Sequence, residues 1–193
     1  MEGGFFEGTT IQKADFTVTP LEKGEYEECS FISCDFSASD LSGIIFTDCR
    51  FTYCNLSLAG VTMAAFRDVR FIECKMLGID FSTCNKTGLS FSFEKCMLSN
   101  SSFRNIIIKK TSFVNSLLAE ADFTECNLSG SLFESCDLTR AVFENTVIEK
   151  CDFRTSFNYS IDPEINRIKR AKFSLHGVPG LLQKYNIEID FDS

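Results

Sequence analysis

The chain has 193 residues, a formal net charge of -8, 44% hydrophobic residues, and 21 Phe but no Trp. This length is typical of one domain with a substantial core. The sequence contains no 18-residue apolar run, which argues against a membrane span, and its start, MEGGFFEGTT, lacks the features of a signal peptide. We therefore expect a cytoplasmic protein without a membrane association.

The charge is unevenly distributed along the chain. Residues 1–66 contain ten acidic residues and only three basic ones, whereas a basic cluster occupies residues 167–172. Because an acidic body repels phosphate, we expect no direct nucleic-acid binding. The charge suits a partner that is itself basic.

A five-residue repeat dominates the sequence. A large apolar residue occupies every fifth position from Phe16 to Phe81 and again from Phe93 to Phe153. Nine of the ten Cys lie two residues before such a position, and Cys84 lies two residues before position 86, where the first run would continue. A period of five fits neither an α-helix nor a β-strand. It fits a coil of square cross-section, whose narrow interior holds one large and one small residue from each side. The sequence therefore predicts an all-β fold, a right-handed quadrilateral β-helix.

The number of repeats sets the size of this solenoid. From Phe16 to Phe153, with the two extra residues at the break set aside, the chain makes 27 steps of five residues and thus 28 repeats, or about seven coils of 20 residues. At a strand spacing of ~4.8 Å, the rod is roughly 34 Å long. We assign residues 1–157 to the β-helix and residues 158–193 to a C-terminal capping and dimerisation segment.

The repeat changes register at residues 82–92. Phe81 and Phe93 are twelve residues apart rather than ten, and Lys86 would point inward if the register continued. A buried, unpaired Lys is costly, so we expect a two-residue bulge or a short loop. The break is either a neutral insertion or a projecting element that contacts a partner through Lys86.

Acidic residues align on one outer face of the expected coil. Glu28, Asp48 and Asp68 are twenty residues apart and should lie above one another, with Glu27 beside them. Stacked like charges repel and cost stability. The column is therefore either a partner-binding face or a chance alignment of polar positions.

After Phe153 the regular pattern ends. Asp162-Pro163 indicates a turn or a helix start, and Ser174 is a candidate N-cap. Solenoids need capped ends, so we expect an apolar C-terminal patch to pack either within the chain or against a second chain in a homodimer. The dimerisation candidates are Phe173, Leu175, Leu181, Leu182, Tyr185 and Ile187.

The sequence offers no catalytic constellation. His176 is the only histidine, and the spacings of the cysteines give no CxxC pair of the kind that zinc sites use. We therefore predict no enzyme activity, no metal and no cofactor, and we interpret the cysteines as core residues. A redox-active thiol protein is the weaker alternative, because reactive thiols must be accessible.

Several segments resemble known proteins. ADFTE (121–125), CNLSG (126–130) and CDLTR (136–140) resemble the A(D/N)Lxx signature of the pentapeptide-repeat family. Residues 54–81 and 161–190 resemble the topoisomerase-interacting branch of that family, which includes the Qnr quinolone-resistance, albicidin-resistance and microcin B17 immunity proteins.

This resemblance implies a function. It implies a DNA-mimicking dimeric rod that binds DNA gyrase or topoisomerase IV and modulates it or protects it from quinolones or toxins. It also implies that residues 180–190 form the dimer contact. The long projecting loops of Qnr proteins are missing, and only the break at 82–92 stands in their place. A non-catalytic scaffold for another bacterial partner is the alternative function.

Overall fold

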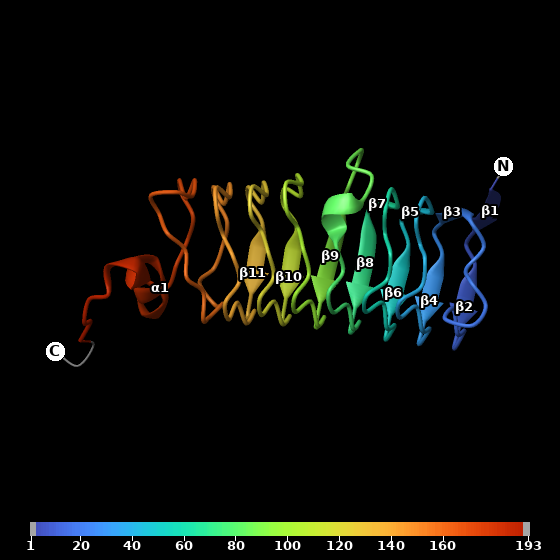
Figure 1. Cartoon of the computed structure of the whole chain (residues 1–193), viewed down its shortest axis with the longest axis horizontal. Coiled ribbons are helices and arrows are strands. Elements are labelled where there is room, and N and C mark those ends of the chain that lie inside the picture. The colour runs from blue at the N-terminus through green and yellow to red at the C-terminus, as the bar shows by residue number, and fades with distance from the viewer. Residues whose placement is uncertain (1–2, 191–193) are drawn as a thin grey trace.

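The computed structural model describes residues 3–190, which wind into a rod with the two termini at opposite ends (Figure 1). Neighbouring strands run parallel, and over the first coils they are 20 residues apart, so that Phe31 lies beside Phe51. The molecule is the predicted β-solenoid of about seven coils, and the expected fold class is confirmed.

Two faces of the coil carry regular strands. One sheet has the strand order β1-β3-β5-β7, and the other has the order β11-β10-β9-β8-β6-β4-β2. The remaining faces are held by single-residue bridges, such as Asp35 with Asn55 and Ser102 with Asp122. The strands are β1 (Gly4–Glu7), β2 (Thr10–Gln12), β3 (Gly24–Glu27), β4 (Ser30–Ile32), β5 (Ile45–Thr47), β6 (Arg50–Thr52), β7 (Ala65–Arg67), β8 (Val69–Ile72), β9 (Phe91–Glu94), β10 (Ser112–Val114) and β11 (Leu132–Glu134).

The five-residue repeat fills the interior with stacked side chains. Phe93 stacks on Phe113 with ring centroids 5.2 Å apart, and Phe113 stacks on Phe133 at 4.8 Å. Each pair lies in successive coils, so one aromatic column runs along the rod. Stacked and edge-to-face rings contribute about 0.5–1.5 kcal/mol per pair beyond their burial.

Polar residues shape the corners of each coil. The side chain of Asp35 accepts a hydrogen bond from the N–H of Ser37 at 2.8 Å, and Asp122 accepts one from Thr124 at 2.9 Å. This is the turn that Asp and Asn favour. At Asp15, hydrogen bonds from the hydroxyl and N–H of Thr17 lower the pKa of the carboxyl. Asp or Asn directly before the large residue therefore indicates a turn at the corner of the coil.

The coiled backbone extends beyond the repeats that the sequence revealed. At the N-terminus β1 pairs with β3, and at the C-terminus Asp152 bridges Lys172, so pairing continues past the expected boundary at residue 157. The sequence pattern fades there because Asn158 and Pro163 stand where large apolar residues are expected, and the buried Tyr159 lies one residue away from the five-residue spacing. A separate role for residues 158–193 stays a prediction.

A short helical segment follows the last coil. Helix α1 (Pro179–Leu182) lies between the 3-10 turns Leu175–Gly177 and Gln183–Tyr185, and Ser174 caps the first turn by accepting a hydrogen bond from Gly177 N–H at 3.1 Å. Leu181 packs against the core. Within residues 3–190, no helix has the length and apolarity that a membrane crossing requires.

Candidate partner-binding surface

The three acidic residues expected to align do lie in register on one corner of the coil. Glu28, Asp48 and Asp68 are all exposed, and each has a positive φ of 52–53°. Asp48 N–H donates to Arg67 O at 2.8 Å, which locks the corner to the next coil. Asp tolerates this left-handed conformation, so the corner geometry alone favours Asp at two of the three positions. Glu27 lies beside the column and is half-buried.

The charge of this corner reverses halfway along the rod. Because β8 pairs with β9 at an offset of 22 residues, Ser90 is the next member of the column after Asp68 and donates its hydroxyl to the Asp68 carboxylate at 2.8 Å. The column then continues with Lys110, Gly130, Lys150 and Arg170. The spacing of twenty residues did not predict this reversal, although the same column extended across the two-residue offset contains Lys110, Lys150 and Arg170.

A shallow groove marks the point where the charge changes sign. It has a volume of about 500 Å³ and contains Asp48 and Asp68 on one side and Lys110 on the other. Arg50 and Arg70 also line it. On this corner, the acidic stretch is therefore restricted to the first coils, and positively charged groups border it.

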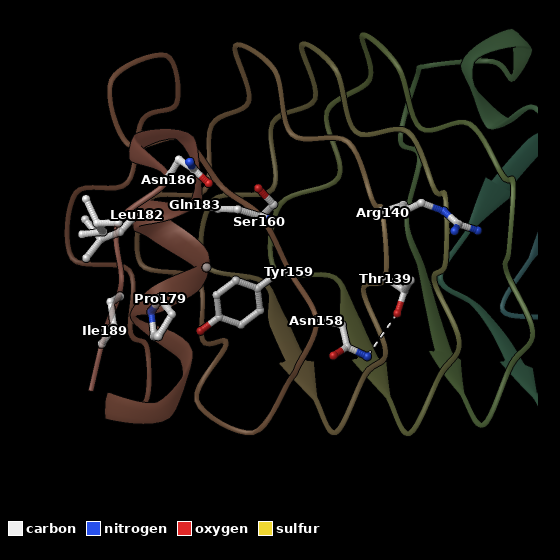
Figure 2. A pocket seen from close by; sticks show the side chains of 12 residues that line it. Thr139, Arg140, Asn158, Tyr159, Ser160, Pro179, Leu182, Gln183, Asn186 and Ile189 are labelled. Atoms are coloured by element: carbon white, nitrogen blue, oxygen red, sulfur yellow. Dashed lines mark hydrogen bonds between the residues drawn. The ribbon is translucent and has the colours of Figure 1, made fainter. Parts of the chain in front are cut away.

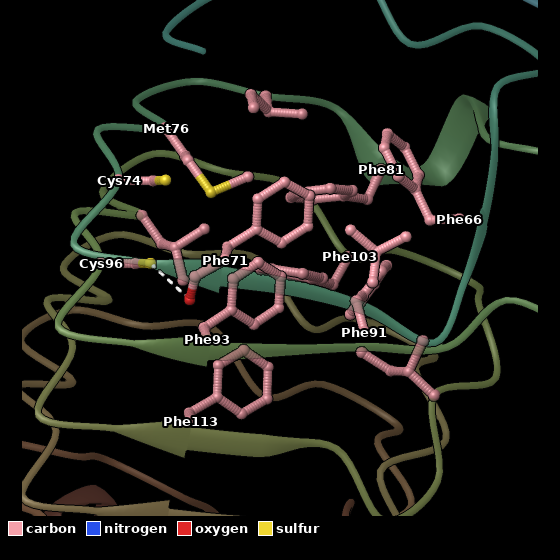
Figure 3. Close-up of a cluster of buried hydrophobic side chains, with 14 of the residues drawn as sticks. Phe66, Phe71, Cys74, Met76, Phe81, Phe91, Phe93, Cys96, Phe103 and Phe113 are labelled. Atoms are coloured by element: carbon pink, nitrogen blue, oxygen red, sulfur yellow. Dashed lines mark hydrogen bonds between the residues drawn. The ribbon is translucent and has the colours of Figure 1, made fainter. Parts of the chain in front are cut away.

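Lys86 is exposed and lies outside the core. Phe91 pairs in register with Val69, at an inward position that smaller residues hold in the other coils, and places a large ring in the core beside the break. The ammonium group of Lys86 donates to Asn105 O at 2.7 Å, while Phe91 is buried with its ring 5.2 Å from that of Phe81 and 5.0 Å from that of Phe93 (Figure 3). The two extra residues let the chain loop outward and return with Phe91 pointing inward. The loop projects from the rod beside β9 (Figure 1). Its role in partner binding stays a prediction.

The six candidate dimerisation residues do not form one continuous exposed patch. Phe173 stacks on Phe153 at 5.4 Å and is part of the core end, and Leu181 packs on the core as well. Leu182 is half-buried. The exposed members are Leu175 (76% exposed), Tyr185 (50%) and Ile187 (56%). The first group caps the solenoid, and the second is free to contact another molecule.

The C-terminal segment is fastened to the last coil by polar contacts. Lys184 forms ion pairs with Asp162 at 2.8 Å and Glu164 at 2.5 Å, and the hydroxyl of Tyr185 donates to Glu164 at 2.7 Å. These contacts hold the exposed apolar side chains in place.

An open groove separates this segment from the preceding coils. Its volume is about 1030 Å³, and Thr139, Arg140, Tyr159 and Gln183 are among the residues that line it (Figure 2). The Tyr159 hydroxyl is buried and has no hydrogen-bond partner within residues 3–190. It lies against Gly177, where an added Cβ would be 1.8 Å from the hydroxyl oxygen. The Tyr159 side chain thus serves packing.

All ten cysteines are buried and reduced. Burial raises the pKa of Cys49 and of Cys151 to about 12. Cys96 differs, because a hydrogen bond from the Cys74 thiol lowers its pKa, but its side chain is only 1% exposed. The thiols therefore fill the core, as the repeat position predicted.

We expect the native protein to react slowly with the thiol reagent DTNB at pH 8, because the reactive thiolate is both disfavoured and inaccessible. The rate of absorbance change at 412 nm measures this reaction. The protein unfolded in guanidinium chloride should release the full ten equivalents at once. Rapid labelling of most cysteines in the folded protein would instead support the redox alternative.

The described part of the chain holds no group of three or more His, Cys, Asp or Glu side chains that could bind a metal ion. The fold and surface define a parallel β-solenoid protein with a filled interior and a charged exterior. The model of the family named Pentapeptide repeat region matches residues 24–92 and 90–158. The chain belongs to the pentapeptide-repeat family.

Comparison with solved structures supports the fold. A trypsin-treated variant of QnrB1, a plasmid-mediated fluoroquinolone resistance protein, has a TM-score of 0.72 at 19% identity, and the match covers 98% of this chain and 92% of the QnrB1 chain. Full-length QnrB1 has a TM-score of 0.63 at 18% identity, with 95% and 100% coverage. Comparison with curated protein sequences gives no significant match.

Proposed function

We propose that this protein is a dimeric rod that mimics duplex DNA, binds DNA gyrase or topoisomerase IV in the cytoplasm, and modulates the enzyme or protects it from quinolones or toxins. The observation that carries the proposal is the exposed acidic corner formed by Glu28, Asp48 and Asp68 on a rigid rod. The resemblance of the fold to QnrB1, a fluoroquinolone resistance protein, points the same way. The protein acts as a binding surface without catalysing a reaction.

The acidic corner is a short and sparse copy of DNA. Its carboxylates are one coil apart, at about 4.8 Å, whereas duplex DNA carries one charge per about 1.7 Å of its axis. The corner becomes basic at Lys110. The topoisomerase contact is therefore confined to the N-terminal coils, and the chain itself does not bind nucleic acid through this acidic part.

A supercoiling assay tests the proposal. Purified protein is added to DNA gyrase and relaxed plasmid, with and without ciprofloxacin, and topoisomerase IV is tested in parallel by decatenation. We expect inhibition of supercoiling at micromolar protein, or recovery of supercoiling in the presence of the drug. No effect on either enzyme, with or without drug, would refute the proposed function.

We propose that the exposed C-terminal side chains form the homodimer contact. Replacing Leu175 and Ile187 together with Asp should convert the dimer to a monomer, because burying a carboxylate in an apolar interface is costly. Light scattering after size exclusion measures the mass. These two positions are chosen because they are exposed, whereas Asp at Leu181 would disturb the cap.

The matched control is Leu58→Asp, which alters an exposed side chain (67%) in an early coil and should leave the mass unchanged. If the double variant has the same mass as the parent protein, this C-terminal contact is not the dimer interface.

A scaffold for another bacterial partner is the second candidate function. Lys75, Met97 and Leu117 bridge one another along one face, and Met97 and Leu117 are 41% and 44% exposed. Adjacent outward apolar side chains on a flat face favour protein binding. This function would survive loss of the acidic corner, which separates the two candidates.

A further inference from the structure

The N-terminal end of the rod differs from the C-terminal end. Strands β1 and β2 are the outermost strands of their sheets, each paired on one side only. At the other end, Leu181 and the short helical segment cover the last coil. An edge strand with open backbone groups is a template for another strand.

The coil repeat identifies the open backbone groups on β2. In the second coil, Ser30 N–H donates to Thr9 O at 2.9 Å, and Ile32 O accepts from Lys13 N–H at 2.9 Å. Thr10 and Gln12 are the equivalents of Ser30 and Ile32 one coil earlier. The N–H of Thr10 and the C=O of Gln12 therefore face away from the rod, with no backbone partner among residues 3–190.

The core is also partly uncovered at this end. Phe6, Ile11 and Phe16 are half-buried, whereas their equivalents in the next coil, Tyr26, Phe31 and Phe36, are at most 2% exposed. Phe6 stacks on Tyr26 at 4.6 Å and Phe16 on Phe36 at 4.5 Å, so one side of each ring is occupied. A ligand that covers the other side of the rings buries apolar surface, which favours binding.

The negative charge around the N-terminal coil favours a basic ligand. Residues 4–43, which form the first two coils, contain eight acidic residues and two basic ones, Lys13 and Lys23. Lys23 is already paired with Asp40 at 2.9 Å. Stacking this end against the same end of a second copy would bring the acidic coils together, which is repulsive. A basic ligand is attracted.

We propose that the N-terminal coil binds an extended segment of another protein, with alternating basic and apolar side chains, which adds a parallel strand to β2. The backbone of the segment pairs with Thr10 and Gln12. Its apolar side chains cover Ile11 and the neighbouring rings, and its basic side chains lie near Glu7 and Glu28. This mode of recognition takes affinity from backbone hydrogen bonds and specificity from alternate side chains. It does not depend on topoisomerase binding.

Fluorescein-labelled peptides test the proposal by fluorescence anisotropy. The probe is KVKVKVK, with EVEVEVE as the charge control and KKVVVKK as the control for alternation at constant composition. We expect KVKVKVK to bind at least ten-fold more tightly than either control. Equal binding of KVKVKVK and KKVVVKK would mean electrostatic adhesion alone and would overturn the proposal.

The variant Thr10→Pro tests the site on the protein. It removes the open N–H without deleting a hydrogen bond of the folded chain, and proline is tolerated on edge strands. We expect KVKVKVK affinity to fall about ten-fold, with an unchanged circular dichroism spectrum. Glu7→Lys should also weaken binding, whereas Glu188→Lys at the far end of the chain should not. Unchanged affinity in both Thr10→Pro and Glu7→Lys would place the peptide elsewhere and overturn the proposal.

Hydrogen exchange on the unaltered protein gives an answer even if Thr10→Pro does not fold. Saturating KVKVKVK should slow exchange of the Thr10 amide, and little change is expected at the Ser112 amide in the middle of the rod. No slowing at Thr10 contradicts strand addition. If light scattering shows that the unaltered protein self-associates and Thr10→Pro abolishes this, the occupant is a second copy and the proposal of a basic partner is wrong.

Discussion

Replacing Phe113 with Ala is expected to lower the free energy of unfolding by about 3–5 kcal/mol. Its side chain is 0% exposed, stacks on Phe93 and Phe133, and meets the edges of Phe103 and Phe123 at 5.9 and 6.1 Å. Backbone hydrogen bonds fix the spacing of successive coils, so the surrounding backbone cannot move into the space that the smaller side chain leaves. The loss of unfolding free energy should therefore lie near the upper end of the range for large-to-small core substitutions.

Guanidinium chloride unfolding followed by circular dichroism measures this loss. The control is Ile107→Ala, which shortens a nearby apolar side chain that is 64% exposed and should change the free energy of unfolding by at most about 0.5 kcal/mol. A loss below about 1 kcal/mol for Phe113→Ala would show that the interior repacks freely, contrary to the stacked core.

Reversing the acidic corner is expected to abolish the effect on DNA gyrase while the protein stays folded. The variant carries Glu28→Lys, Asp48→Lys and Asp68→Lys, and changes the formal charge of the corner from -3 to +3. Lys fits these positions, because Lys110 and Lys150 occupy equivalent corners with φ values of 59° and 60°. A basic corner would be repelled by an enzyme surface that binds DNA. The supercoiling assay, with and without ciprofloxacin, measures the outcome.

The same column provides the control for this variant. Lys110→Glu with Lys150→Glu alters charge on the basic half of the corner, where the proposed enzyme contact is not made. We expect this control to keep its effect on gyrase. If the triple variant remains active in a folded state, the acidic corner is not the topoisomerase contact, and the apolar face at Met97 and Leu117 becomes the stronger candidate.

The register break illustrates how far the sequence could be interpreted. Twelve residues between Phe81 and Phe93, together with the inward position of Lys86, indicated an interruption, and β8 and β9 pair with an offset of 22 residues. The periodicity places Phe91 inward, two residues before Phe93, but it did not predict that a side chain this large would fit at the position of Val69 in the preceding coil. Which residue points inward after an outward loop depends on the path of the backbone and on contacts with neighbouring coils.

The geometry of the candidate acidic corner was predicted only in part. The spacing of twenty residues correctly aligned Glu28, Asp48 and Asp68, because identical coils place equivalent residues above one another. It did not reveal that the same corner becomes basic beyond the break. Likewise, the apolar residues near the C-terminus are evident in the sequence, but only packing distinguishes Phe173, which stacks on the core, from the exposed Leu175.

The sequence by itself determined the solenoid, the interior position of the large and small residues, and the burial of all ten cysteines. It could do so because each repeat contacts its neighbours in the same way, so a local pattern specifies the whole rod. Only the tertiary structure decided how far the coiling extends within residues 3–190, which side chains close the C-terminal end, and which backbone groups of β2 have no backbone partner among the described residues. Those features arise at the interruption and at the ends, where a residue lacks the neighbour that the repeat would supply.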